Sequence, residues 1–154
     1  LFFAGNRPAV NVGVSVSRVG GAAQTKAMKK ASGSLRIDLA QYREMEVFTQ
    51  FASDLDDATK EQLAYGKCLM ELLKQPLCRP LSNHEQVITL WVATHKVMLD
   101  VELKKVKEFQ MDMLAYFDKN YPEIGKQIEE KKVLDEELGN KILEVAEEFK
   151  NKSR

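Results

Sequence analysis

Arg18 is the residue with the clearest capacity for chemistry, because the chain before it would hold it at the end of a rigid segment. Residues 10–16 alternate valine with small or polar residues, and a period of two is typical of a half-buried β-strand. Gly20 follows, and a glycine there frees the backbone to turn. A planar guanidinium in this place can reach outside its own fold and pair with a carboxylate or a phosphate.

The residues alone also allow an ordinary reading of this segment. Arg18 could be a surface or salt-bridging arginine at a strand end. Ser15 and Ser17 lie opposite the valine face, and neither has a histidine close in sequence that could activate it as a nucleophile. We therefore expect these serines to face solvent or an interface.

The stretch 8–20 reads PAVNVGVSVSRVG, and it resembles a signature of the alpha subunit of F-type (rotary) ATP synthases. The signature combines a proline, a small residue, an aliphatic residue, Asn or Asp, three variable residues and Ser-x-Ser. Four later segments resemble the same family in the same order: 24–30, 38–44, 50–56 and 72–76. The resemblance therefore covers essentially the whole chain and is closest to bacterial-type members.

The resemblance implies a role for Arg18 as an arginine finger that enters the catalytic site of the neighbouring beta subunit. Phosphoryl transfer develops negative charge around the γ-phosphate, and a guanidinium suits that charge. In the family, the strand before the finger lies at the alpha–beta interface. Residues 1–21 are then the end of a nucleotide-binding domain, and residues 22–154 are the C-terminal helical bundle domain.

The resemblance also implies that Phe2, Arg7 and Gln75 lie near the base of a nucleotide in the alpha subunit's own noncatalytic site. An aromatic or guanidinium plane can pack on adenine, and an amide can hydrogen-bond to its edge. From the residues alone they are a core phenylalanine, a surface arginine before Pro8 and a polar residue at a helix end. Many relatives have a second glutamine where this chain has Leu77, which implies a different arrangement around the base.

No Gly-x-x-x-x-Gly-Lys-Ser/Thr motif occurs, so the phosphate cradle of such a nucleotide is missing from this sequence. We expect ATP or ADP with Mg²⁺ in a full-length subunit, and no cofactor, metal site or hydrolysis for this stretch alone. The chain starts with Leu1 and runs from a hydrophobic segment into a strand, so we expect it to be part of a longer protein.

Composition narrows the classes of partner. The 154 residues suffice for one domain with a core, and 23 basic residues balance 23 acidic ones. Residues 1–36 carry six basic residues and no acid, but they lack the interleaved aromatics of a nucleic-acid site. Cys68 and Cys78 lack metal spacing and are expected to be reduced thiols. No apolar run reaches the length of a transmembrane helix, and the apolar start at Leu1 follows no basic stretch, so we expect no signal peptide.

After the strand, the sequence predicts a mainly α fold, a bundle of about six helices with short connections. The first is a short helix from 25 to 30. A second ends near Phe51 and presents one apolar face: Leu35, Leu39, Tyr42, Met45 and Phe48. Ser53 begins a capping box that opens a third helix. That helix is expected to bury Leu63, Met70 and Leu73 and to stop before Pro76.

The second half of the bundle is predicted in the same way. Ser82 begins another capping box, and the helix after it turns Val87, Leu90 and Trp91 inward. The remaining helices are marked by three apolar sets: Val106, Phe109, Met113 and Phe117; Ile124 and Ile128; Leu138, Ile142, Val145 and Phe149. The charges from Lys104 onward are expected to form solvated faces.

The resemblance implies an assembly of beta subunits, a gamma rotor subunit and other subunits at the cytoplasmic face of the bacterial membrane. Contact with the membrane would be peripheral, through the membrane-embedded sector, and no nucleic acid would bind. One alternative is a free-standing helical interaction module, which would leave the 8–20 segment without a purpose. A vacuolar-type or secretion ATPase paralogue is another, and the Ser-Val-Ser-Arg-Val-Gly stretch disfavours it.

Overall fold

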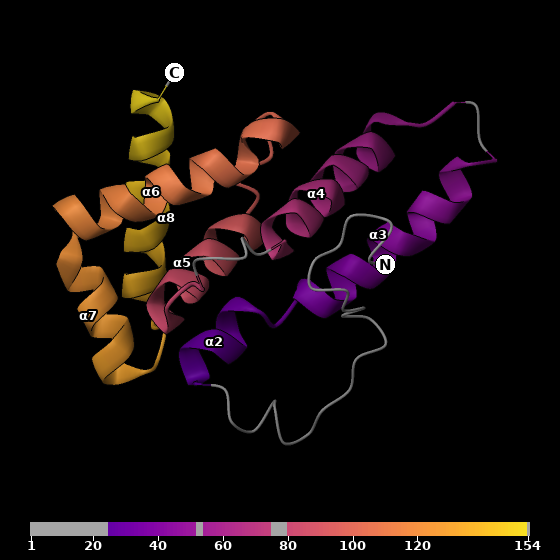
Figure 1. The fold of residues 1–154 in the computed structure, drawn as a ribbon. Coiled ribbons are helices and arrows are strands. Elements are labelled where there is room, and N and C mark those ends of the chain that lie inside the picture. Colours follow the sequence, from indigo (N-terminus) through magenta and orange to yellow (C-terminus); the bar gives the residue numbers. More distant parts are fainter. Residues whose placement is uncertain (1–24, 52–53, 75–79, 154) are drawn as a thin grey trace.

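Helices dominate the architecture. The computed structural model describes residues 25–51, 54–74 and 80–153, which form seven α-helices and one 3-10 helix and no strand (Figure 1). In chain order these are α2 (Lys26–Ala31), α3 (Leu35–Thr49), α4 (Asp57–Leu73), α5 (Asn83–Thr94), η1 (Leu103–Lys105), α6 (Val106–Asn120), α7 (Pro122–Lys131) and α8 (Glu136–Lys152). The predicted helical bundle is thus confirmed. The strand predicted before Arg18 lies outside the described residues.

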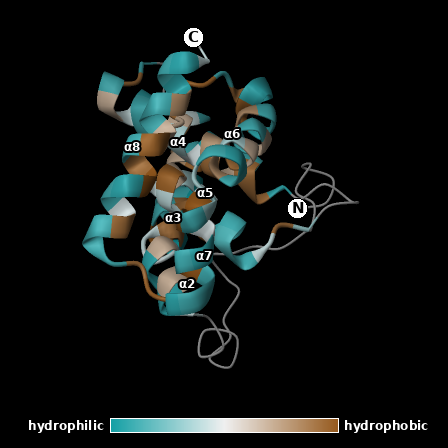
Figure 2. Ribbon diagram, turned by 90° about the vertical axis from the view of Figure 1, so that its left-hand side faces the viewer, coloured by the Kyte–Doolittle hydropathy of each residue, from teal (hydrophilic) through white to brown (hydrophobic). Residues whose placement is uncertain are grey.

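Helix α5 is the centre of the bundle, in contact with α2, α6, α7 and α8. Its Val87, Ile88 and Val92 are almost completely buried, and they pack in one core with Met113 and Ile142. Figure 2 shows hydrophilic residues over much of the outer surface of the helices and hydrophobic ones turned inward. Burial of this apolar surface is the main source of stability for such a bundle.

Helices α3 and α4 pack against each other, and their connected ends project from the other helices (Figure 1). Near the bundle, Leu35 and Leu39 are buried as predicted, and the Tyr65 hydroxyl donates to Asp38 over 2.9 Å. The prediction for Phe48 is wrong: 66% of its surface is exposed. Phe48 is exposed because it lies near the end of α3 that projects from the bundle, where the other helices do not cover its side chain (Figure 1).

Two predictions for α4 are also wrong. The helix begins at Asp57 with Asp56 as its N-cap, so Ser53 is too early in the chain to cap it. The buried stripe is Tyr65, Cys68, Leu69 and Leu72, whereas Leu63, Met70 and Leu73 are only half-buried. Helix α4 packs against both α3 and α6, so its buried face differs from the one that apolar spacing alone predicts. The thiol of Cys68 is free and buried, and Cys78 lies outside the described residues.

The second half follows the predicted pattern closely. The Ser82 hydroxyl accepts the first-turn bond from the Glu85 amide over 3.5 Å, which confirms the predicted start of α5. Val87 is buried, while Leu90 and Trp91 are half-buried at the edge of the core. Phe109 and Phe149 are also half-buried, and their rings pack with centroids 5.2 Å apart. Among the described helices, none combines the length and the apolar character needed to cross a bilayer.

Candidate functional site

The four residues predicted to act on nucleotides, Phe2, Arg7, Arg18 and Gln75, all lie outside the described residues. Their placement therefore stays a prediction. The structure does describe the helix ends next to them in the chain. These are the start of α2, which follows the Arg18 segment, and the two ends of the connection from α4 to α5, which contains Gln75.

The start of α2 is held firmly against the rest of the bundle. The Thr25 hydroxyl accepts from the Met28 amide over 3.2 Å and caps the helix. The Ala27 amide donates to the Lys132 carbonyl over 2.9 Å, although the two residues are far apart in the chain. The Lys30 ammonium, in the last turn of this short helix, donates to the Leu134 carbonyl, also over 2.9 Å. These bonds hold α2 against the connection between α7 and α8.

The C-terminal end of α4 is held by α6. Lys74, the first residue after α4, adopts an extended backbone. The Lys107 ammonium, from α6, donates to the Leu72 carbonyl over 2.9 Å. A cation at a helix C-terminus is favourable because the last carbonyls carry partial negative charge. Burial lowers the pKa of Lys107, and the neighbouring charge of Glu71 opposes that shift.

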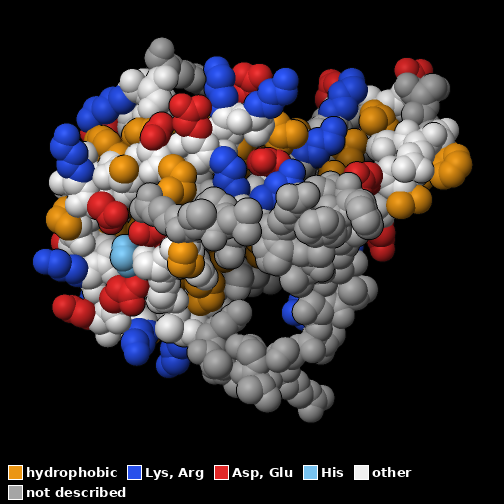
Figure 3. All heavy atoms as spheres, in the orientation of Figure 1, with side chains coloured by type: hydrophobic (Ala, Val, Ile, Leu, Met, Phe, Trp, Pro, Cys, Tyr) orange, Lys and Arg blue, Asp and Glu red, His pale blue; other side chains and the backbone are white. Residues whose placement is uncertain are grey.

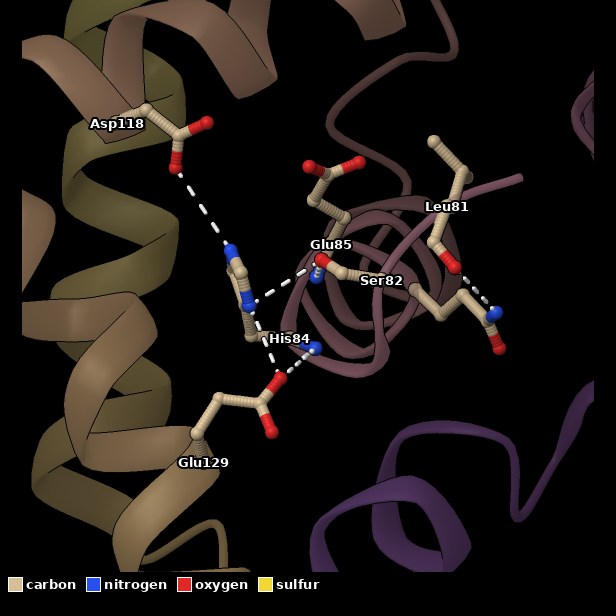
Figure 4. Close-up of polar contacts among 7 residues, drawn as sticks. Leu81, Ser82, His84, Glu85, Asp118 and Glu129 are labelled. Carbon is tan, nitrogen blue, oxygen red and sulfur yellow. Dashed lines mark hydrogen bonds and ion pairs between the residues drawn. The ribbon is translucent and has the colours of Figure 1, made fainter. Parts of the chain in front are cut away.

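The start of α5 is held by its own side chains and by α7 (Figure 4). The Gln86 amide nitrogen donates to the Leu81 carbonyl over 2.9 Å. One Glu129 oxygen lies 2.9 Å from the His84 backbone nitrogen and 3.0 Å from ring atom Nδ1. The bonds from His84 lower the pKa of Glu129, and the ring hydrogen bond is the largest cause.

The His84 ring lies between α6 and α7. Its Nε2 lies 3.7 Å from an Asp118 carboxylate oxygen on α6. A side chain at Gly125 would place a Cβ 3.0 Å from ring atom Cδ2, so the glycine leaves room for the imidazole. In the described parts of the chain, no group of His, Cys, Asp or Glu side chains is arranged to hold a metal. Through its contacts with Glu129 and Asp118, His84 joins the start of α5 to α7 and α6.

A hollow of about 390 Å³ lies between α6 and the two ends of the connection from α4 to α5. Lys74 lines it from the end of α4, Leu81 from the start of α5, and Lys107 and Gln110 from α6. Both ends of the connection that contains Gln75 therefore border one space. A mostly apolar hollow with a few polar groups is the usual character of a small-molecule site.

A second feature is the α3 edge, a strip of exposed apolar side chains at the projecting end of the molecule. Its members are Val47, Phe48 and Phe51, each more than half exposed, with Phe51 at 85%. Figure 3 shows hydrophobic side chains at this projecting end. An exposed group of large apolar side chains is typical of a protein–protein contact surface.

Comparison with known proteins decides the family. Residues 24–149 match the family model described as "ATP synthase alpha/beta chain, C terminal domain". The chain belongs to this family. The match covers almost all of the described helices, and it agrees with the helical bundle that the sequence predicted.

Several proteins similar to this chain carry the name ATP synthase subunit alpha. The chain is 49% identical to the one from Clostridium kluyveri over 150 residues, 97% of this chain. It is 51% identical to those from Aquifex aeolicus over 152 residues (99%) and Acetivibrio thermocellus over 151 residues (98%). The chain spans 30% of the length of each of these relatives. The predicted resemblance to bacterial alpha subunits is thereby confirmed.

Sequence reasoning missed the polar residues that hold the helix ends. No sequence motif points to Lys107, Gln110 and Thr89. These residues come together only because α4, α5 and α6 pack against one another. His84 stands inside the predicted capping box, but the box says nothing about its carboxylate partners on α6 and α7. The one signal in the sequence is a polar residue at a position where helical spacing predicts burial. Gln110 is such a residue, and it is buried.

Proposed function

We propose that this chain is the C-terminal part of an F-type ATP synthase alpha subunit and acts within that assembly. The observation that carries the proposal is the match of nearly the whole chain, at about half identity, to proteins named ATP synthase subunit alpha. In such an assembly, alternating alpha and beta subunits surround a gamma rotor, and proton flow drives ATP synthesis. The assembly lies at the cytoplasmic face of the bacterial membrane as a peripheral sector.

Arg18 is the proposed arginine finger, supplied in trans to the beta-subunit site. Its guanidinium would stabilise the charge that develops around the γ-phosphate during transfer. The hydrogen bonds that hold α2 support this role, because an arginine finger must be positioned by its own subunit. Residues 1–21 then complete the nucleotide-binding domain, and residues 22–154 form the bundle domain.

Phe2, Arg7 and Gln75 would line the base side of the noncatalytic nucleotide site, which holds ATP or ADP with Mg²⁺ in the full-length subunit. The hollow beside Lys74 and Leu81 supports a ligand-facing position for Gln75, because that residue follows Lys74 directly. The phosphates would be held by parts of the subunit outside this sequence. The stretch alone is therefore expected to bind nucleotide weakly and to hydrolyse none.

The bundle would supply contacts to the beta subunits and to the rotor. The α3 edge supports this role, because its phenylalanines project from the bundle with large exposed surfaces. Charged residues on the remaining outer faces suit contacts that remain hydrated.

The experiment that tests the proposal is ATP hydrolysis by the reconstituted assembly with Arg18→Ala in the alpha subunit. Turnover should fall by about 10³-fold or more, while assembly and nucleotide affinity at the catalytic sites persist. Arg36→Ala is the matched control, since it removes an exposed arginine of α3 to which no role at a nucleotide site is assigned. Turnover within a few fold of the parent for Arg18→Ala would contradict the finger role.

A further inference from the structure

A groove of about 440 Å³ lies between α6 and the C-terminal end of α8. Its main lining residues come from these two helices: Glu108, Phe109, Asp112, Phe149 and Lys150. The remaining wall is formed largely by the segment 100–105, which ends in η1. We call this feature the α6–α8 groove. Its volume is large enough to accept side chains of another molecule.

The α6–α8 groove carries an excess of negative charge. Four acidic side chains and two lysines line it, so its formal net charge is −2, whereas the whole chain has 23 acidic and 23 basic residues. Both lysines are already paired. Lys150 Nζ lies 3.0 Å from an Asp100 carboxylate oxygen, and Lys105 Nζ lies 3.6 Å from one of Glu102. The excess charge therefore belongs to the two remaining carboxylates, both on α6.

These two carboxylates are Glu108 and Asp112, which are four residues apart and exposed. Among the described residues, neither side chain takes part in a hydrogen bond or an ion pair. Lys107, the nearest lysine in the sequence, donates instead to the Leu72 carbonyl and to Gln110. Like charges at this spacing repel on a helix surface and destabilise it. A cation bound between them would remove that repulsion.

Aromatic rings lie beside the two carboxylates. Phe109 and Phe149 are half-buried, and their rings pack with centroids 5.2 Å apart at a tilt of 56°. Both line the groove, so part of each ring is accessible from it. Aromatic rings attract cations to their faces and pack well with apolar side chains. The groove thus offers negative charge and an apolar surface side by side.

We propose that the α6–α8 groove is a docking site for a basic segment of a partner protein. A lysine or arginine of that segment pairs with Glu108 and Asp112, and an apolar residue beside it packs against Phe109 and Phe149. Arginine and aromatic side chains are the residues most enriched at the centres of protein–protein interfaces. This inference does not depend on the roles proposed for Arg18 or for the nucleotide site.

The lining of the groove favours a protein segment over a free ion. In the parts of the chain that the structure describes, no group of His, Cys, Asp or Glu side chains is arranged to hold a metal. A hydrated ion would also gain little from the aromatic rings. A peptide supplies a cation and an adjacent apolar side chain together, and the long stem of lysine or arginine can itself lie on an apolar surface.

Fluorescence anisotropy of a labelled peptide, titrated with the folded protein, tests the proposal. The probe is a helical peptide that repeats Lys-Ala-Ala-Leu, which places lysine and leucine on one face. A peptide that repeats Glu-Ala-Ala-Leu is its counterpart and should not bind. Glu108→Gln combined with Asp112→Asn should weaken binding of the lysine peptide by about tenfold at low salt, the combined value of two exposed ion pairs.

Matched variants locate the binding. Glu144→Gln combined with Glu147→Gln removes two exposed carboxylates of α8 that do not line the groove, and should leave the affinity unchanged. Ser153→Lys adds a cation inside the groove and should weaken binding. Asn151→Lys adds one at an exposed position outside it and should not. Because all these positions are exposed, each variant should fold like the parent, which thermal unfolding checks.

A loss confined to the groove variants, and a weaker parent affinity at about 0.5 M salt, would support the docking site, because salt screens exposed charges. An equal loss in the Glu144 and Glu147 variant would show a general attraction to acidic surfaces and would overturn the proposal. The proposal is also overturned if the lysine peptide does not bind, or binds equally well without the Glu108 and Asp112 charges. None of these results affects the role of Arg18, whose test measures turnover.

Discussion

The indole nitrogen of Trp91 donates to the carbonyl oxygen of Gly139 over 3.0 Å, and the ring lies directly where a side chain at position 139 would project. A Cβ there would be 2.8 Å from a ring carbon of Trp91. This close approach joins α5 to α8. The Lys30 ammonium from α2 lies 5.6 Å from the centre of the same ring, so three helices meet at Trp91.

We expect Gly139→Ala to destabilise the bundle despite the better helix propensity of alanine. The added methyl must displace the Trp91 ring and its hydrogen bond, at a cost of about 1–3 kcal/mol, which exceeds the roughly 1 kcal/mol gained from propensity. Urea unfolding followed by Trp91 fluorescence measures the difference. Asn140→Ala, at the exposed neighbouring position, should not lower stability; equal stability of both variants would contradict this account.

Glu129 should make a contribution to stability that depends on pH. Its pKa is lowered from 4.5 in the folded protein, chiefly by the hydrogen bond from the His84 ring. The stabilisation is therefore present above the ordinary pKa of 4.5 and is lost as the pH falls through the lowered folded value. Because the carboxylate is substantially exposed, the contribution should be under about 1 kcal/mol.

Thermal unfolding of Glu129→Gln across the acidic range tests that dependence. The variant should be less stable than the parent at pH 7, and the difference should disappear toward pH 3. Glu130→Gln removes the same charge at an exposed adjacent position and should show no such trend. A difference that stays constant from pH 7 to pH 3 would mean that the bond to His84 does not stabilise the ionised carboxylate.

Cys68 should resist modification while the bundle is folded. Burial raises the pKa of its thiol to about 11, with a smaller contribution from the charge of Glu71. At pH 8 only about one thiol in a thousand is then ionised, and the thiolate is the reactive form. In a Cys78→Ser chain, maleimide labelling should be slow in buffer and fast in urea. Equal rates in the two conditions would show that Cys68 is accessible.

Phe51→Ser should separate the role of the α3 edge in binding from any role in folding. The side chain is almost fully exposed, so thermal unfolding of the chain should change by less than about 0.5 kcal/mol. Reconstitution with beta and gamma subunits should yield less assembled complex, because apolar contact area is lost. Gln50→Ser changes an adjacent exposed residue and should assemble normally. Undiminished assembly of Phe51→Ser would contradict a contact at this edge.

The sequence by itself determined the helices and the family. Apolar spacing predicted α6, α7 and α8 with their buried Met113, Ile128 and Ile142, and the Ser82 box predicted the start of α5. These features depend on residues close together in the chain, whose hydrogen bonds and side-chain spacing operate within one helix. The PAVNVGVSVSRVG stretch and the segments after it predicted the resemblance that the comparisons confirmed.

Only the tertiary structure decided which parts of those helices are covered and which polar groups meet. Phe48 stands on the same predicted face as Leu35, yet it is exposed because α3 extends beyond its neighbours. Lys107 meets Leu72, and His84 meets Glu129, across contacts between helices distant in sequence. Periodicity assigns a residue to a face of its own helix, but burial and pairing depend on what packs against that face.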